Sequence, residues 1–326
     1  MKRRALLQAA GALAAPLTEV ARGSTTANDR DQKVFRWAFP AAETGFDPAQ
    51  ISDLYSNYIV SHIFEAPLQY DFLARPAKIR PRTAAAMPDV SDDFRTFTVR
   101  LRPGIYFQDD PAFKGRRREL VAADYVYQLK RVADPRWKSP LWSTIESAAV
   151  IGLAALRKQA QAVGRFDYDS DIEGIRALDR YTFQVRLEAP QPRFADNFTD
   201  ARPFGAVARE VVEAYENEIM GKPVGTGPFR LVSWKRASSI VLERNPGYRE
   251  DLYDAEPAAD DARGQADHCR ALDGGPQRAL PAGVGHALQL VDVVGRDQFA
   301  ALAFERRVVL EVDARAQPDR ERPEIT

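Results

Sequence analysis

The chain has 326 residues, of which 45% are hydrophobic, and its 46 basic residues balance its 46 acidic ones. This length allows a large buried core and suggests two domains, while the zero net charge argues against a nucleic-acid or anionic-membrane partner held by bulk charge. One cysteine and three histidines exclude an intrachain disulfide and disfavour a metal centre.

The first residues have the pattern of an export signal. Lys2, Arg3 and Arg4 precede a weakly apolar run at 5–17, and small and polar residues follow it. The run is too short to span a bilayer, so we interpret residues 1–27 as a signal peptide. The arginine pair resembles a twin-arginine signal, with a general secretory signal as the alternative. No cysteine lies near the expected cleavage point, so we expect a soluble exported protein without a lipid anchor.

The next segments form a strand, a turn and a helix. Residues 33–39 alternate polar and apolar side chains, which is typical of a half-buried strand, and residues 45–48 have the Gly and Asp-Pro composition of a turn. Apolar residues recur at helical spacing between 54 and 64, which predicts a helix there. Asp53 or Ser52 can cap its first turn.

Another strand and two helical regions follow before residue 164. Residues 94–102 alternate and end at a Pro-Gly turn, after which residues 105–107 are expected to form a second short strand. Residues 122–133 have apolar positions at helical spacing, with an acidic first turn and a basic last turn. We also expect residues 139–163 to be helical.

The later segments again mix strands and helices. Residues 181–187 alternate as a strand, and residues 208–215 are expected to form a short helix. The stretch Pro-Val-Gly-Thr-Gly-Pro, residues 223–228, predicts a turn that leads into strands at 229–234 and 239–243. Together these elements indicate an α/β protein of mixed α+β architecture.

The motif search points away from catalysis. The sequence lacks the hydrolase nucleophile elbow, the zinc-protease helix motif, the P-loop and a Cys-x-x-Cys pair, and residues 225–227 lack the third glycine of a dinucleotide loop. Aspartates alternate at 167–171 without the register of an EF-hand, and His62 is interpreted as a packed residue. The basic cluster at 114–118 is interpreted as a solvated loop, with phosphate binding as the alternative. We therefore expect no catalytic residues, no metal site and no cofactor.

Four blocks of sequence carry a family resemblance: residues 46–48 with 63–68, residues 96–107, residues 122–131 and residues 223–248. In this order they resemble the family 5 extracellular solute-binding proteins of bacterial ABC transporters, the dipeptide- and oligopeptide-binding group. The last block is the most specific, because it joins Pro-Val-Gly-Thr-Gly-Pro to a closing Asn-Pro-Gly-Tyr.

The resemblance implies a clamshell fold of the periplasmic-binding-protein type II kind. Such a protein closes on a peptide and delivers it to an ABC permease in the inner membrane. The resemblance also places the ligand against Ser52, Asp53, Leu54, Tyr55 and Ser56, where main-chain groups do much of the binding. It implies a periplasmic monomer that binds without catalysis and has no nucleic-acid partner.

The resemblance further predicts how the chain is divided. Residues 33–60 and 175–260 are expected to form a discontinuous main lobe, and residues 61–174 an inserted second domain. Family members are longer and continue into a further lobe, so we expect one lobe to be missing at the C-terminal end. Residues 261–326 change in composition and are interpreted as a frameshifted tail, with a genuine but irregular segment as the alternative. Within them, residues 307–312 are strand-like.

Two alternatives to peptide binding stay open. Within the same family, the solute could be a sugar, an opine or a nickel complex, although the few histidines disfavour a histidine-bound metal. From another class, the chain could be an exported hydrolase or chaperone-like protein, and the hydrolase would require a nucleophile–base pair that the sequence does not display.

Overall fold

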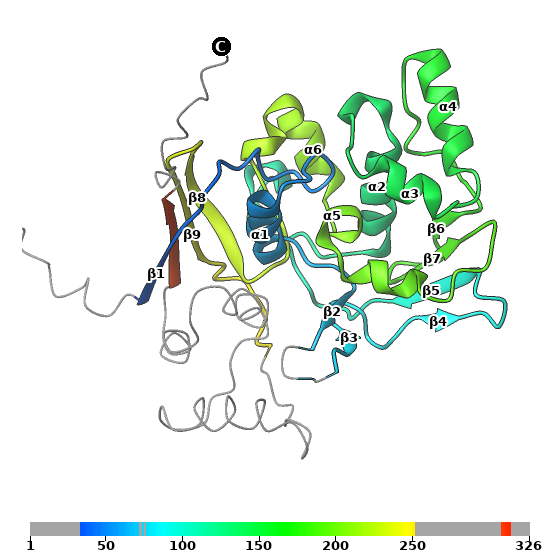
Figure 1. Ribbon diagram of the computed structural model, residues 1–326, viewed down its shortest axis with the longest axis horizontal. Coiled ribbons are helices and arrows are strands. Elements are labelled where there is room, and N and C mark those ends of the chain that lie inside the picture. The colour runs from blue at the N-terminus through cyan, green and yellow to red at the C-terminus, as the bar shows by residue number, and fades with distance from the viewer. Residues whose placement is uncertain (1–32, 72–73, 75, 252–307, 314–326) are drawn as a thin grey trace, which may run out of the picture.

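The computed structural model consists of two four-stranded sheets and one two-stranded sheet with helices between and around them (Figure 1). The structure describes residues 33–71, 74, 76–251 and 308–313.

The first sheet has the strand order β1-β10-β9-β8. Strand β10 runs parallel to β1 and antiparallel to β9, and β8 and β9 form a hairpin. Figure 1 shows this sheet beside helix α1, at the opposite end of the described structure from the second large sheet. Its strands are β1 (Lys33–Ala38), β8 (Phe229–Lys235), β9 (Ser239–Arg244) and β10 (Val308–Asp313).

The second sheet has the antiparallel order β4-β5-β7-β6, and β2 pairs with β3 in a separate hairpin. Alternation along β5 and β7 buries Phe97, Val99, Phe183 and Val185 on the face that packs under helix α2, where Tyr125 stacks on Phe183. The strands are β2 (Leu68–Tyr70), β3 (Ile79–Pro81), β4 (Asp89–Val90), β5 (Thr96–Arg100), β6 (Ile175–Ala177) and β7 (Thr182–Arg186).

The helices have short, well-marked ends. Helix α2 begins after Val121, which has no side-chain acceptor, and the Asp124 carboxylate instead accepts a hydrogen bond from the Val121 N–H at 2.8 Å. The α-helices are α1 (Leu54–Ile63), α2 (Ala122–Ala133), α3 (Trp142–Ser147), α4 (Leu153–Val163), α5 (Ala201–Phe204) and α6 (Arg209–Tyr215). The 3₁₀ helices are η2 (Pro111–Phe113), η3 (Pro135–Trp137), η4 (Phe194–Thr199) and η5 (Glu216–Gly221).

Most predicted elements are confirmed, and two predictions are wrong. The helix at 122–133 and the strands at 229–234 and 239–243 appear as α2, β8 and β9. The expected helix at 139–163 is instead split into α3 and α4, because Ala149 and Gly152 adopt positive φ angles of 51° and 79°. The expected strand at 105–107 is reduced to one bridge between Tyr106 and Glu119.

The predicted division into lobes stays a prediction. Strands β6 and β7 pair with β5, which favours a boundary later than residue 175. Residues 1–27 and most of 261–326 lie outside the described residues, so the signal peptide and the frameshifted tail also stay predictions. The strand-like pattern at 307–312 is confirmed as β10.

The Gly-Thr-Gly turn lies against the end of α1. The Gly227 N–H donates to the Ile63 carbonyl oxygen at 2.8 Å, and the Gln108 N–H donates to the Gly225 carbonyl oxygen at 2.9 Å. A Cβ atom on Gly225 would lie 2.0 Å from the Ile63 oxygen, and one on Gly227 would lie 2.5 Å from the His62 oxygen. This close backbone contact makes the turn an architectural feature.

We expect Gly225→Ala to lower the free energy of unfolding by ~1–3 kcal/mol or more, because its methyl group would force the turn away from α1. Gly247→Ala is the matched control, since its Cβ would lie 3.5 Å from the nearest atom. The control should change stability by less than ~0.5 kcal/mol. Urea unfolding measures both, and equal effects would show that the turn tolerates a side chain.

Candidate functional site

The predicted ligand-facing residues form the end of a loop and the first turn of α1. Ser52 is exposed and Leu54 is 54% exposed, whereas Ser56 is buried and Asp53 and Tyr55 are half-buried. Ser52 and Leu54 therefore offer surface to a ligand, and their neighbours hold that surface in place.

Asp53 fixes the start of α1. Its carboxylate accepts hydrogen bonds from the Ser56 N–H at 2.8 Å and from the Thr44 hydroxyl at 2.5 Å. The Ser56 hydroxyl oxygen accepts from the N–H groups of Thr44 and Gly45 at 3.0 and 3.3 Å. Burial raises the pKa of Asp53, but these hydrogen bonds outweigh it and hold the pKa below its usual value. The helix start is thus capped by an ionised carboxylate.

Asp53, the residue just ahead of α1, has an extended backbone, and its carbonyl oxygen accepts from the Asn57 N–H at 3.1 Å. Asp53 has φ −77° and ψ 153°. The main-chain N–H and carbonyl of Ser52 form no backbone hydrogen bond with another described residue, and the same holds for the N–H of Leu54. The first N–H groups of a helix have no partner within it, and the Leu54 N–H accordingly has no backbone acceptor among the described residues. Exposed main-chain groups in this conformation can pair with a strand-like ligand.

Aromatic side chains of α1 stack on aromatic side chains in and just after β1. Trp37 stacks on Tyr58 with ring centroids 5.3 Å apart, and Tyr55 stacks on Phe39 at 4.6 Å. Burial, together with Tyr55, raises the pKa of Tyr58 and keeps its hydroxyl protonated. Tyr55 and Tyr58 lie in the stretch that the sequence placed at the ligand, whereas Trp37 was missed, because its contact with Tyr58 depends on how β1 lies beside α1.

A buried ion pair holds the loop that leads into α1. Both Asp47 carboxylate oxygens accept from the Arg131 guanidinium at 2.8 Å, and the two side chains are 1% and 0% exposed. Phe46 packs on Trp234 at 4.9 Å between ring centroids, and the Trp234 Nε1–H donates to Glu43. The loop is therefore fixed against both α2 and β8.

A second buried charge cluster follows α1. The fully buried Glu65 carboxylate accepts from Arg82 at 3.0 Å and from Arg249 at 2.8 and 2.9 Å. Burial alone would raise the pKa of Glu65, but Arg249 and Arg82 lower it to about 2. Tyr248 donates its hydroxyl to the same carboxylate at 3.3 Å. The cluster ties the end of α1 to the segment that leaves β9.

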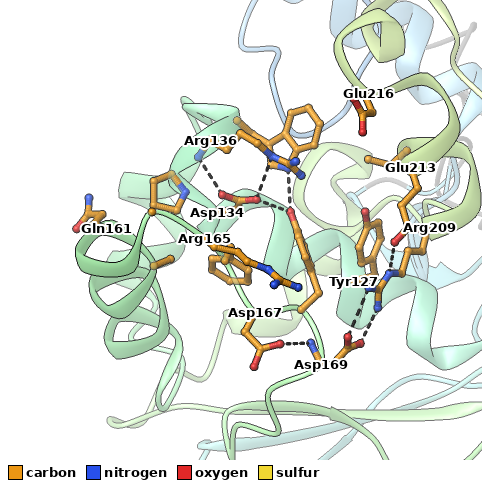
Figure 2. A pocket seen from close by; sticks show the side chains of 17 residues that line it. Tyr127, Asp134, Arg136, Gln161, Arg165, Asp167, Asp169, Arg209, Glu213 and Glu216 are labelled. Carbon is orange, nitrogen blue, oxygen red and sulfur yellow. Dashed lines mark hydrogen bonds and ion pairs between the residues drawn. The ribbon is translucent and has the colours of Figure 1, made fainter.

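A separate cavity of about 610 Å³ lies between η3, the end of α4 and α6 (Figure 2). The Tyr168 hydroxyl accepts from the Trp137 Nε1–H at 2.9 Å and donates to Asp134 at 2.7 Å. Arg209 donates to Asp169 at 2.6 Å. These polar groups already bond one another, so we place the candidate solute site at the start of α1.

The weaker motif candidates take structural roles. His62 is buried, and its Nδ1–H donates to the Tyr58 carbonyl oxygen at 2.6 Å. Asp167 accepts from the Ser170 hydroxyl at 2.7 Å, and within the described residues no group of three His, Cys, Asp or Glu side chains could hold a metal. Cys269 lies outside the described residues. None of the described helices is long and apolar enough to cross a membrane.

Comparison with known proteins identifies the family. Residues 78–264, more than half of the chain, match the profile described as bacterial extracellular solute-binding proteins, family 5 Middle. The chain belongs to this solute-binding family. Its mixed helix and strand architecture is that of periplasmic binding proteins, as the solved structures below show.

Similar proteins include peptide-binding proteins. The di/tripeptide-binding protein 2 of Pseudomonas aeruginosa (strain UCBPP-PA14) is 29% identical over 232 residues, which are 68% of this chain and 38% of that protein. The glutathione-binding protein GsiB of Pectobacterium atrosepticum is 25% identical over 206 residues, 63% and 33% of the two chains. The structure of Burkholderia pseudomallei OppA matches with a TM-score of 0.54 at 27% identity, and the match covers 67% of this chain and 39% of that one. This family 5 chain thus spans well under half the length of these relatives.

We expect Glu65→Gln to lower the free energy of unfolding at neutral pH by ~3–5 kcal/mol, because two arginines lose their buried counter-charge. The pKa of Glu65 falls from 4.5 to about 2 on folding, so its ionised form stabilises the fold above about pH 4.5. That contribution is lost as the pH falls toward 2.

Urea unfolding between neutral pH and pH ~3 measures this effect, and the difference between wild type and Glu65→Gln should shrink as the pH falls. Asp89→Asn is the control, because the Asp89–Arg100 pair is exposed. It should cost less than ~1 kcal/mol. A difference for Glu65→Gln that stays constant with pH would contradict the assignment.

Proposed function

We propose that this chain is the solute-binding component of an ABC importer and that it binds a peptide without catalysing a reaction. Family membership supports the binding role. Two of the relatives above are named for binding di- and tripeptides or glutathione, and glutathione is itself a tripeptide.

The main-chain groups of Ser52 and Leu54, on either side of the extended residue Asp53, carry the peptide proposal. An extended peptide presents alternating N–H and carbonyl groups, which can pair with main-chain groups held in the same conformation. Ser52 offers its N–H and carbonyl oxygen, and Leu54, the first residue of α1, offers its N–H; none of these has a backbone partner among the described residues. Asp53 between them is extended and caps the helix. Because these contacts do not involve the ligand's side chains, they suit peptides of many sequences.

The surroundings of this segment favour the same ligand. The ion pair between Asp47 and Arg131 fixes the loop before binding, so little conformational entropy is lost when a peptide pairs with it. The Tyr55 ring at the start of α1 lies 6.2 Å from that of Tyr58, which stacks on Trp37, and these half-buried rings offer apolar and aromatic surface to peptide side chains.

The cellular setting belongs to the same proposal. Residues 1–27 would direct export to the periplasm, where the protein would act as a soluble monomer and pass its solute to a permease in the inner membrane. Binding would shift the equilibrium between open and closed forms, and the permease would recognise the closed form.

Thermal unfolding of the full chain with a panel of solutes tests the class of ligand. Di-, tri- and pentapeptides and glutathione are compared with a sugar, an opine and a nickel complex. A bound solute at 100 times its Kd should stabilise the protein by ~2.7 kcal/mol. We expect stabilisation by peptides; stabilisation by a sugar, an opine or a nickel complex alone would overturn the peptide proposal.

Leu54→Pro tests main-chain recognition. Leu54 is the first helical residue, where proline fits, and Asp53 before it already has the extended conformation that proline requires. The variant removes one free N–H and should weaken peptide binding by about tenfold while the melting temperature stays unchanged, because a hydrogen bond contributes about 1 kcal/mol. Affinity is measured by isothermal titration calorimetry.

Leu54→Ala is the matched control, because it shortens the same side chain and keeps the N–H. It should bind peptides within about threefold of wild type, since the lost side-chain contact is small. If Leu54→Ala weakens binding as much as Leu54→Pro, the side chain and not the main chain makes the contact.

A further inference from the structure

The loop after η2 lines a broad basic groove. This groove, of about 1230 Å³, runs between the loop and helix α6, and none of its lining residues belongs to the proposed solute site. Its charged lining comprises Lys114, Arg116, Arg117, Arg118 and Arg180, with Glu119, Glu210 and Glu213.

The loop is firmly anchored at its base. Asp110 caps η2 by accepting from the Ala112 N–H at 2.8 Å, and the Tyr215 hydroxyl donates to the same carboxylate at 2.9 Å. Phe113 is buried. Lys114 and Gly115 then adopt left-handed conformations with φ of 54° and 75°, which turn the chain sharply back. The basic side chains that follow are thus presented by a fixed turn.

The carboxylates of the groove are already neutralised. Glu119 pairs with Arg180 at 2.8 Å, and Glu210 pairs with Arg118 at 2.9 Å. Glu213 pairs at 2.6 Å with Arg209, which lies outside the groove lining. Each carboxylate of the groove is therefore paired with an arginine, and none is left to balance the positive charge of the loop.

Three cations of the loop have no such partner. Lys114, Arg116 and Arg117 are exposed, and no carboxylate of a described residue lies within 4.0 Å of their charged groups. The Arg117 guanidinium lies 3.8 Å above the Tyr106 ring, which restrains its orientation without neutralising it. Burial raises the pKa of Glu210, but Arg118 and, more weakly, Arg116 lower it, so the charge of Arg116 acts on this groove.

We propose that the basic groove binds a phosphate-bearing anion. Two arginines and a lysine on one short turn provide the planar, forked donors that match phosphate oxygens, together with a point charge. The excess of positive charge is local, so it is compatible with a chain whose net charge is zero. The phosphate could belong to a soluble compound or to a lipid headgroup.

Binding of two probes to the full chain tests this proposal and separates the two sources. Pyrophosphate is titrated calorimetrically at low ionic strength, because salt screens exposed charges. Vesicles of phosphatidylglycerol and phosphatidylcholine are compared with phosphatidylcholine vesicles by cosedimentation. Binding of pyrophosphate assigns the groove to a soluble phosphate, and binding of the anionic vesicles alone assigns it to a lipid headgroup.

A triple variant with Lys114→Gln, Arg116→Gln and Arg117→Gln should bind at least about tenfold more weakly to whichever of the two probes binds the wild-type chain. The matched control carries Arg95→Gln, Arg100→Gln and Arg193→Gln, which remove the same charge from exposed positions outside the groove. Both variants should melt near the wild-type temperature, because all the substituted side chains are exposed.

Three results would overturn the proposal. The wild-type chain could bind neither probe. The two triple variants could lose binding equally, which would show an effect of bulk charge. Finally, a hexaglutamate peptide could bind as tightly as pyrophosphate, which would make the groove a surface for acidic peptides. The proposal is supported if the control variant keeps binding and the variant at 114, 116 and 117 loses it.

Discussion

The described part of the structure depends most on the buried contact between Asp47 and Arg131. The two residues are 84 positions apart and come from the loop before α1 and the last turn of α2. Taking two charges out of water costs on the order of several kcal/mol each, and only a close, well-bonded pair offsets this cost. Here both carboxylate oxygens are bonded and the Trp137 ring lies 4.5 Å from the guanidinium, while the buried Arg131 Nε–H has no acceptor among the described residues. Neither partner can move without leaving a charge unpaired, so the loop and α2 behave as one unit.

This constraint explains why the candidate solute site lies where it does. The same loop buries Phe46, Ala49 and Ile51 completely. These apolar side chains and the charged side chains of Glu43 and Asp47 are all buried, and the chain then turns into α1. Where the loop ends, the Ser52 N–H and carbonyl and the Leu54 N–H have no backbone partner among the described residues. The position of the proposed binding surface is a consequence of how the loop is anchored.

Local pattern was enough to predict elements whose cause is local. Helix α2 was predicted with its observed bounds because apolar spacing and the acidic residue Asp124 act within twelve residues. The break after α3 was not predicted, since Ala149 has a positive φ that its side chain does not favour. The strand-like pattern at 307–312 gave β10, but no pattern in it specifies pairing with β1, at the other end of the chain.

The same distinction applies to the site. Residues 52–56 were placed there by family resemblance, because main-chain recognition leaves little trace in side-chain identity. Trp37 was missed because its pairing with Tyr58 is tertiary. The basic cluster at 114–118 was visible in the sequence. Only the structure shows that the neighbouring carboxylates are already paired, which leaves three cations of this cluster without partners.

The two proposed sites therefore respond to substitution in opposite ways. A site built from main-chain groups tolerates side-chain changes but fails when the backbone shifts, so its integrity rests on remote features such as the Gly225 contact and the Asp47–Arg131 pair. A site built from exposed cations tolerates modest backbone movement but fails when charge is removed. One chain can thus keep its solute site through many surface substitutions while its basic groove is gained or lost. The two activities need share no residue, and a defect in one does not imply a defect in the other.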